Sequence, residues 1–186
     1  MSEQRCAVVA VLGAPNAGKS TLVNTLVGAK VAAVTQKVQT TRALVRGIAM
    51  QDQTQIILID TPGVFAPKRR LDRAMVAAAW SALEGADAIV HVVDAPAHLH
   101  AGKSGAADAL SVEDSTRIAE KLKQMEIASL LVLNKVDAVS RPALLELTTK
   151  LVEQGLYTDV FMISAKSGDG VEDLMRVLVE RAPEGP

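Results

Sequence analysis

The chain has 186 residues, of which 49% are hydrophobic and 22% charged, and its formal net charge is −1. This composition excludes an intrinsically disordered chain, and the near-neutral charge lacks the basic excess typical of nucleic-acid-binding proteins. Because the length fits one domain and aromatic residues make up only 2%, the core must consist mainly of aliphatic side chains, which suits a parallel sheet covered on both faces.

The N-terminal residues and the single cysteine bear on the cellular compartment. Cys6 has no second cysteine with which to form an intrachain disulfide, and this is compatible with a reducing compartment. Met1 to Arg5 leads directly into a strand pattern without the long apolar region of a signal peptide, and no apolar stretch is long enough to span a bilayer. We therefore expect a cytoplasmic protein.

A glycine-rich loop lies between the first predicted strand, Ala7–Leu12, and a predicted helix, Lys19–Val27. The loop fits the pattern G-x-x-x-x-G-K-[ST], and its strand–loop–helix context is the one in which that pattern binds phosphate. The alternative is a chance glycine turn before a helix, which the Lys-Ser pair and the upstream strand disfavour. The predicted nucleotide-binding residues here are Gly13, Ala14, Pro15, Asn16, Ala17, Gly18, Lys19, Ser20 and Thr21.

This loop supplies both charge and a metal ligand. Its glycines let backbone N–H groups turn toward phosphate oxygens, and the helix N-terminus adds its positive dipole end. Lys19 is predicted to lie between the β- and γ-phosphates, and the Ser20 hydroxyl to bind Mg²⁺.

The next segment, Gln36–Arg42, is polar and has no helical pattern. One of its two threonines, Thr40 and Thr41, is predicted to close over the γ-phosphate and to ligate Mg²⁺ through its hydroxyl, and we favour Thr41. This segment and Gly63–Arg70 are the predicted switches, which the γ-phosphate would order.

Two strands, Leu44–Met50 and Gln55–Asp60, are predicted to form a hairpin that ends in a second phosphate-side motif. The motif is Asp60-Thr61-Pro62-Gly63. Asp60 is predicted to hold a water of the Mg²⁺ shell, and the Gly63 N–H to reach the γ-phosphate. An ordinary Asp-containing turn is the alternative, which is disfavoured because the spacing from the first loop leaves room for one helix and two strands.

The middle of the chain carries weaker signals. A helix is predicted over Arg70–Leu83, and the basic run Lys68-Arg69-Arg70 with Arg73 is interpreted as a solvated loop and helix start. Ala95–Ser111 is predicted to be a flexible loop, since its Gly-Lys-Ser lacks the upstream strand of a second phosphate loop. His98 and His100 within it are expected to be solvated rather than to bind a metal.

Strands and helices alternate through the rest of the chain, which indicates βαβ units. We therefore predict an α/β fold of the P-loop NTPase type, with three α/β/α layers and a mostly parallel six-stranded sheet containing one antiparallel strand. The remaining predicted strands are Ala88–Asp94, Ser129–Asn134 and Val160–Ser164, and the remaining helices are Val112–Met125, Arg141–Gln154 and Val171–Arg181.

Two further motifs, each after a strand, indicate recognition of guanine. In Asn134-Lys135-Val136-Asp137, Asp137 would accept hydrogen bonds from the guanine N1–H and 2-amino groups, which adenine lacks. Asn134 would bond the 6-oxo side of the base or tie its loop to the phosphate loop, and the Lys135 stem would cover the base plane. In Ser164-Ala165-Lys166, the Ala165 N–H would donate to guanine O6.

The motifs together resemble the GTPase domains of the Era family, over almost the whole chain. Gln39-Thr40-Thr41-Arg42 favours Era over the Der and MnmE GTPases, whose switches look similar. The resemblance implies GTP and GDP as ligands, Mg²⁺ as cofactor, and a role in 16S rRNA processing and small (30S) ribosomal subunit biogenesis. It also implies a possible peripheral association with the inner membrane, which nothing in this chain demands.

The same resemblance implies a domain division. Residues 1–182 would be the GTPase domain and residues 183–186 a linker stub, and the C-terminal RNA-binding KH domain of the family is expected to be absent from this chain.

The catalytic prediction rests on Asn16, Lys19, Thr41 and Gly63. Val64 stands where Ras-type proteins carry a water-orienting Gln, so catalysis would come from positioning and from charge neutralisation, with Arg42 a conceivable arginine finger. Related GTPases with Asn at the position of Asn16 hold K⁺ against the phosphates, and the alternative for Asn16 is a plain turn residue.

Two other functions remain open for the chain. One is a nucleotide-gated binding module with negligible hydrolysis, and the other is a phosphotransferase, for which no catalytic base is apparent.

Overall fold

The computed structural model describes residues 4–28, 39–40, 43–60, 81, 83–100 and 106–184. Within these residues a seven-stranded sheet has the order β2-β3-β4-β1-β5-β6-β7. Its strands are β1 (Arg5–Gly13), β2 (Gln39–Thr40), β3 (Ala43–Gln51), β4 (Thr54–Asp60), β5 (Ala88–Asp94), β6 (Ser129–Asn134) and β7 (Tyr157–Met162).

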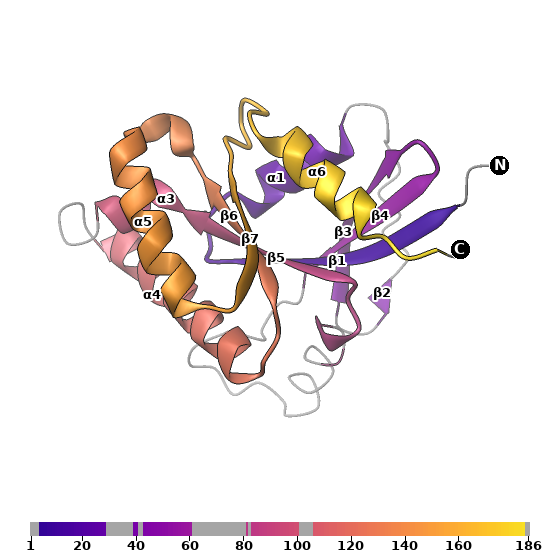
Figure 1. Ribbon diagram of the computed structural model, residues 1–186, viewed down its shortest axis with the longest axis horizontal. Coiled ribbons are helices and arrows are strands. Elements are labelled where there is room, and N and C mark those ends of the chain that lie inside the picture. Colours follow the sequence, from indigo (N-terminus) through magenta and orange to yellow (C-terminus); the bar gives the residue numbers. More distant parts are fainter. Residues whose placement is uncertain are drawn as a thin grey trace.

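The sheet has helices on both of its faces (Figure 1). The helices α1 and α6 lie on one face, and α3, α4 and α5 lie on the other. Their bounds are α1 (Lys19–Val27), α3 (Ala95–Leu99), α4 (Ala106–Gln124), α5 (Arg141–Gln154) and α6 (Val171–Glu180), with a short 3₁₀ turn, η1 (Val136–Ala138). Among the residues placed, no helix has both the length and the apolar character needed to cross a membrane.

The strand directions match the predicted fold class. The strand β1 pairs in parallel with both β4 and β5, and β6 pairs in parallel with β5 and β7. The strand β3 is antiparallel to β4 and to β2, so it is the one strand that runs against the others in the described sheet. All six predicted strands are present, and the two-residue β2 adds a seventh inside the polar segment Gln36–Arg42, for which no strand was predicted.

The core lies on both faces of the central strands because their apolar runs are nearly continuous. Along β1, Val9 and Val11 pack in the cluster under α1 and α6, whereas Ala10 and Leu12 pack in the cluster under α4. All six residues of β6 are buried. Burying both faces of the parallel strands is the arrangement expected for α/β proteins, and it holds the strand ends in fixed relative positions.

The predicted flexible loop over Ala95–Ser111 is wrong at both of its ends. The helix α3 begins directly after β5, because Asp94 caps it: its Oδ1 accepts a hydrogen bond from the Ala97 N–H at 3.0 Å, and Pro96 lies in the first turn. The helix α4 begins at Ala106, six residues before the predicted Val112. The Gly-Lys-Ser at 102–104 lies outside the described residues.

One strand starts earlier than predicted, and residues 183 and 184 make contacts that were not predicted. The strand β7 begins at Tyr157 rather than Val160. Near the chain end, the Cys6 N–H donates to the Pro183 carbonyl at 3.2 Å, and Arg5 forms a bridge with Glu184, so this stretch lies along the start of β1. Most of the predicted helix Arg70–Leu83 lies outside the described residues.

Candidate functional site

The chemical motifs gather at the carboxyl ends of neighbouring strands. The phosphate loop follows β1, Asp60 ends β4, Asp94 ends β5 and Asn134 ends β6. Ser164 follows β7 after one intervening residue. Because these strands are parallel, their carboxyl ends meet at one edge of the sheet, which is where open α/β sheets bind their ligands.

The phosphate loop depends on close contacts that only glycine allows. A Cβ atom at Gly18, which has a φ of 103°, would lie 2.1 Å from Asn134 Nδ2. A Cβ atom at Gly13 would lie 2.6 Å from the Val92 carbonyl oxygen. Gly18 is also the N-cap of α1, and the first turn of a helix carries N–H groups without an intrahelical acceptor. The loop therefore packs tightly on its neighbours while its helix start is able to bind an anion.

Lys19 is the cation of this loop. Its Nζ donates a hydrogen bond to the Gly13 carbonyl at 2.8 Å, so the side chain folds back over the loop. Partial burial lowers the pKa of Lys19, the negative charge of Asp60 opposes that shift, and the positive charge of Arg46 adds to it. The three groups therefore share one electrostatic environment at the phosphate end of the site.

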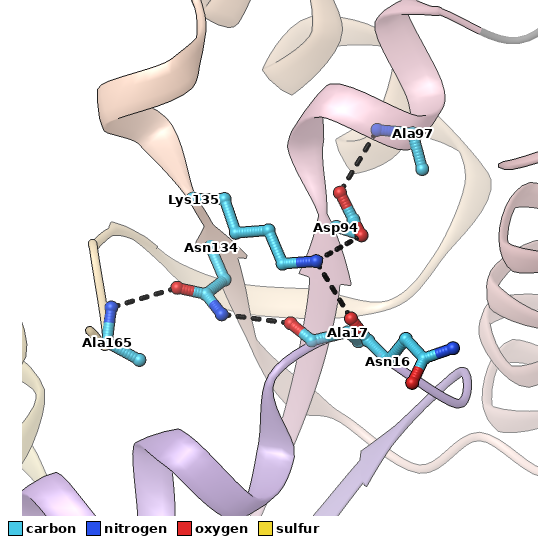
Figure 2. A network of polar contacts seen from close by, with 7 residues as sticks. All are labelled: Asn16, Ala17, Asp94, Ala97, Asn134, Lys135 and Ala165. Atoms are coloured by element: carbon cyan, nitrogen blue, oxygen red, sulfur yellow. Dashed lines mark hydrogen bonds and ion pairs between the residues drawn. The ribbon is translucent and has the colours of Figure 1, made fainter. Parts of the chain in front are cut away.

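Asn134 joins three loops through a single amide (Figure 2). Its Nδ2 donates to the Ala17 carbonyl in the phosphate loop, and its Oδ1 accepts from the Ala165 N–H, both at 2.9 Å. The residue is only 3% exposed. Of the two roles predicted for Asn134, the structure shows the tie to the phosphate loop.

The Ala165 backbone has a different partner from the predicted one. Its N–H donates to Asn134 rather than being free for guanine O6 in this structure. Its carbonyl accepts a hydrogen bond from Thr25 Oγ1 of α1 at 2.7 Å. The loop after β7 is thus held from two sides, and a base could bond the Ala165 N–H only by sharing it with Asn134.

Lys135 lies in a second set of polar contacts, also drawn in Figure 2. Its Nζ donates to Asp94 Oδ2 at 2.7 Å and to the Asn16 carbonyl at 2.9 Å. Asp94 therefore serves both Lys135 and the N-terminus of α3. Asp94 is not among the site residues predicted from the sequence, although it ends a predicted strand, as Asp60 does. Coverage of a base by the Lys135 stem stays a prediction.

The remaining base-side residues lie around this network. Asp137 lies in η1 and is exposed, so its carboxylate is accessible on the same loop as Asn134. Ser164 is 2% exposed, and its N–H donates to the Asp169 carbonyl at 3.0 Å. Lys166 is exposed. The structure thus brings the two predicted base loops together beside the phosphate loop.

Asp60 has a partner that the sequence did not reveal. Its Oδ2 accepts from Arg46 Nη2 at 2.5 Å and from Arg46 Nε at 3.2 Å. The Ser20 hydroxyl is exposed at the start of α1, and Asp60 is 8% exposed. A hydroxyl and a carboxylate are the hard oxygen donors that suit Mg²⁺, so the residues present fit that ion.

Several predicted residues cannot be placed. Thr41, Thr61, Pro62 and Gly63 lie outside the described residues, as do the neighbouring Arg42 and Val64 and the basic run Lys68–Arg70 with Arg73. Only the backbone of Thr40 is described, in β2. Their roles at the γ-phosphate stay predictions.

Of the two histidines expected to be solvated, His98 departs from the expectation and His100 agrees with it. Within the described part of the chain, His98 Nε2 is buried without a hydrogen-bond partner, and His100 is exposed. No group of three His, Cys, Asp or Glu side chains able to hold a metal occurs among the residues placed. The buried histidine of the fold is His91, whose Nδ1 lies 2.8 Å from Tyr157 Oη and whose pKa burial lowers to about 3.

Comparison with known proteins agrees with this geometry. The chain is 56% identical over 184 residues to the GTPase Era of Maricaulis maris, covering 98% of this chain and 59% of that relative. It is 54% identical over 187 residues to the GTPase Era of Caulobacter vibrioides, covering 100% and 59% respectively. The chain therefore spans about three fifths of the length of these curated relatives.

Solved structures give the same result. An Era variant from Aquifex aeolicus bound to GDP and AlF₄⁻ matches with a TM-score of 0.67 and 30% identity, covering 98% of this chain and 59% of that one. A structure of Era with MgGDPNP and a 16S ribosomal RNA fragment matches with a TM-score of 0.65 at the same identity and coverage. The resemblance to the Era family is confirmed.

A family model described as "50S ribosome-binding GTPase" matches residues 8–135, which is more than half of the chain. That range includes the phosphate loop, Asp60 and Asn134. With its loops at the strand ends arranged as described, the chain belongs to this family of GTPases.

Proposed function

We propose that this chain binds GTP and GDP together with Mg²⁺ and hydrolyses GTP to GDP and phosphate. The observation that carries the proposal is the buried Asn134 amide, which bonds the phosphate loop through Ala17 and the last base loop through Ala165. One side chain thereby fixes the separation between a phosphate-binding end and a base-binding end. Such a fixed separation suits a nucleotide rather than a free phosphate or a free base.

At the phosphate end, the chain supplies positive charge and oriented donors. Lys19 Nζ lies over the loop at the Gly13 carbonyl, and the start of α1 follows directly. Ser20 would hold Mg²⁺ through its hydroxyl and Asp60 through a bound water. When bound, Mg²⁺ would neutralise charge on the phosphate oxygens, the term that dominates phosphoryl transfer.

At the base end, Asp137 supplies the selectivity. Its exposed carboxylate in η1 would accept from the N1–H and 2-amino groups of guanine. Adenine offers no donor at either position, so an adenine bound there would take the carboxylate out of water without giving it a partner, at a cost of about 1–3 kcal/mol or more. We therefore infer a strong preference for guanine nucleotides.

The hydrolytic step would depend on positioning and on fixed charge, with Thr41 and Gly63 closing on the γ-phosphate. Asn16 would hold a K⁺ ion against the phosphates. Its φ of 67° is in the left-handed region and its carbonyl already accepts from Lys135, which leaves its exposed side-chain amide available. The variant Asn16→Gly keeps that backbone conformation and removes the amide, so it should abolish any advantage of K⁺ over Na⁺ in turnover. Equal wild-type rates in the two salts would remove this role.

The cellular role we propose is that of Era: processing of 16S rRNA and biogenesis of the small ribosomal subunit, in the cytoplasm. Relatives that share 50–56% identity are named GTPase Era, and a solved Era structure contains a 16S ribosomal RNA fragment. Because this chain spans about three fifths of those relatives, we propose nucleotide binding and hydrolysis as its own share of that role. A peripheral association with the membrane has no support among the contacts described.

The test of the enzymatic proposal is phosphate release from GTP and from ATP by the purified chain with Mg²⁺. We expect phosphate release from GTP but not from ATP. In Lys19→Ala the rate of release should fall by at least about tenfold, because a charge-assisted contact to phosphate is worth about 1.5–3 kcal/mol. Tight GDP binding without any phosphate release would instead support a nucleotide-gated binding module. Release from ATP at the same rate would contradict the proposal.

A further inference from the structure

Arg46 lies at an irregularity of β3 beside the phosphate end of the site. In the antiparallel pairing with β4, Val45 is opposite Ile59 and Gly47 is opposite Leu58, so Arg46 is the additional residue of a β-bulge. Bulges change the direction of side chains and are frequent next to active sites.

The packing on either side shows what the bulge does. Val45 packs against the cluster under α4. Gly47 faces α1 instead, where an added Cβ would lie 2.8 Å from Val27 Cγ2. Residues two apart in a regular strand share one face, so the bulge switches the face between them. Arg46, at the point of the switch, reaches the end of the neighbouring strand and its Asp60 carboxylate.

The two partners of the ion pair between Arg46 and Asp60 differ in their exposure to solvent. Both Nε and Nη2 of Arg46 contact the same oxygen, Asp60 Oδ2, at 3.2 and 2.5 Å. The Asp60 side chain is 11% exposed, whereas that of Arg46 is 40% exposed. The carboxylate is therefore fixed and largely buried, while the guanidinium is able to move into water at modest cost.

The position of this pair matters because Asp60 is the carboxylate that fits the Mg²⁺ shell. A carboxylate already paired with a guanidinium is a weaker acceptor for a metal-bound water, and a second cation nearby repels the metal. At the same time Arg46 adds positive charge close to Lys19, where phosphates would bind, since both Arg46 and Asp60 perturb the pKa of Lys19.

We propose that Arg46 is a positioning residue that competes with Mg²⁺ for Asp60. It supports nucleotide binding through its own charge when the metal is scarce, and it yields Asp60 to the metal-bound water when Mg²⁺ binds. This inference rests on the proposed function. It predicts that Mg²⁺ increases the affinity for nucleotide by a smaller factor in the wild type than in a variant without the Arg46 charge.

The experiment measures binding of fluorescent GDP to the whole chain across a Mg²⁺ titration that begins in EDTA. Arg46→Gln and Arg46→Met, which remove the charge and keep most of the stem, should weaken GDP binding in EDTA by about fivefold, as expected for a partly exposed charge contact. They should also lower the half-effective Mg²⁺ concentration by a similar factor. Arg46→Lys, which keeps the charge, should remain close to wild type.

The matched control is Arg117→Gln, which removes the same charge from a partly exposed ion-pair cluster with Glu113 and Asp114 on α4. It should leave both quantities unchanged. If the folded neutral Arg46 variants respond to Mg²⁺ as wild type and Arg117→Gln do, Arg46 is only a structural partner of Asp60 and the inference is wrong. Failure of the wild type to bind GDP at any Mg²⁺ concentration would instead overturn the proposed function, and the inference with it.

Discussion

Replacement of Asn134 by alanine tests the link that joins the site. The substitution removes the amide that donates to the Ala17 carbonyl and accepts from the Ala165 N–H, and it leaves the rest of β6 unchanged. Both backbone partners are buried, since Ala17 is 0% and Ala165 1% exposed. Water therefore cannot simply take the place of the amide.

The expected loss of stability follows from these two orphaned groups. Leaving a buried donor or acceptor unsatisfied costs about 1–3 kcal/mol, so two such groups, with partial relaxation of the loops, should cost about 2–4 kcal/mol. That is a large fraction of the roughly 5–15 kcal/mol by which domains of this kind are stable. Affinity for GDP should fall by at least about tenfold as well, because the loops proposed to bind phosphate and base are no longer held together.

The assay is urea unfolding of the nucleotide-free protein, followed by GDP titration of the folded variant. Thr149→Ala is the control, because its hydroxyl donates to the Leu145 carbonyl on the exposed surface of α5, and its effect should stay within about 0.5 kcal/mol. The reasoning is refuted if Asn134→Ala loses less than about 0.5 kcal/mol of unfolding free energy or binds GDP as the wild type does.

Two further predictions address the base and the pH dependence. Asp137→Asn should change the preference from guanine to xanthine nucleotides, because the amide donates where the carboxylate accepted. Calorimetry with GDP and XDP measures the preference, and an unchanged preference would exclude Asp137 as the residue that recognises the base. Because burial lowers the pKa of His91 from 6.5 to about 3, the folded protein resists protonation there, and its stability should be full above pH 6.5 and fall as the pH decreases toward 3. Between pH 7 and 4.5 the free energy of unfolding should fall by about 2 kcal/mol through His91. His91→Asn retains a partner for Tyr157 Oη, and its unfolding free energy, measured with urea, should fall less over this range. Parallel pH profiles of the variant and the wild type would contradict this role of His91.

Local patterns were sufficient for most of the fold. The apolar runs predicted all six long strands, and four of them, β1, β4, β5 and β6, are buried along much of their length, as in β6, where all six residues are buried. The strand β7 has no fully buried residue, and its predicted start was three residues late. The glycine pattern located the phosphate loop because its requirements are local: a helix start and a backbone without Cβ atoms. The helix α3 was missed although Asp94 and Pro96 are a local start signal, because the Ala- and Gly-rich residues after them favoured a loop.

The contacts that complete the site could not be predicted in this way, because they join residues far apart in the sequence. Arg46 reaches Asp60 only through the register of β3 against β4 and its bulge. Lys135 meets Asp94 because β5 and β6 end side by side. The sequence left two roles open for Asn134, and packing against the phosphate loop distinguished them.

The loops at the strand ends are proposed to bind a phosphate chain at one end of the site and a guanine base at the other. Isothermal calorimetry with GDP and with ADP, each with Mg²⁺, tests this proposal most directly. The account predicts measurable, saturable binding of GDP and binding of ADP at least about a hundredfold weaker, since several kcal/mol of base contacts are lost with adenine. Equal affinity for the two nucleotides, or no binding of either, would contradict it.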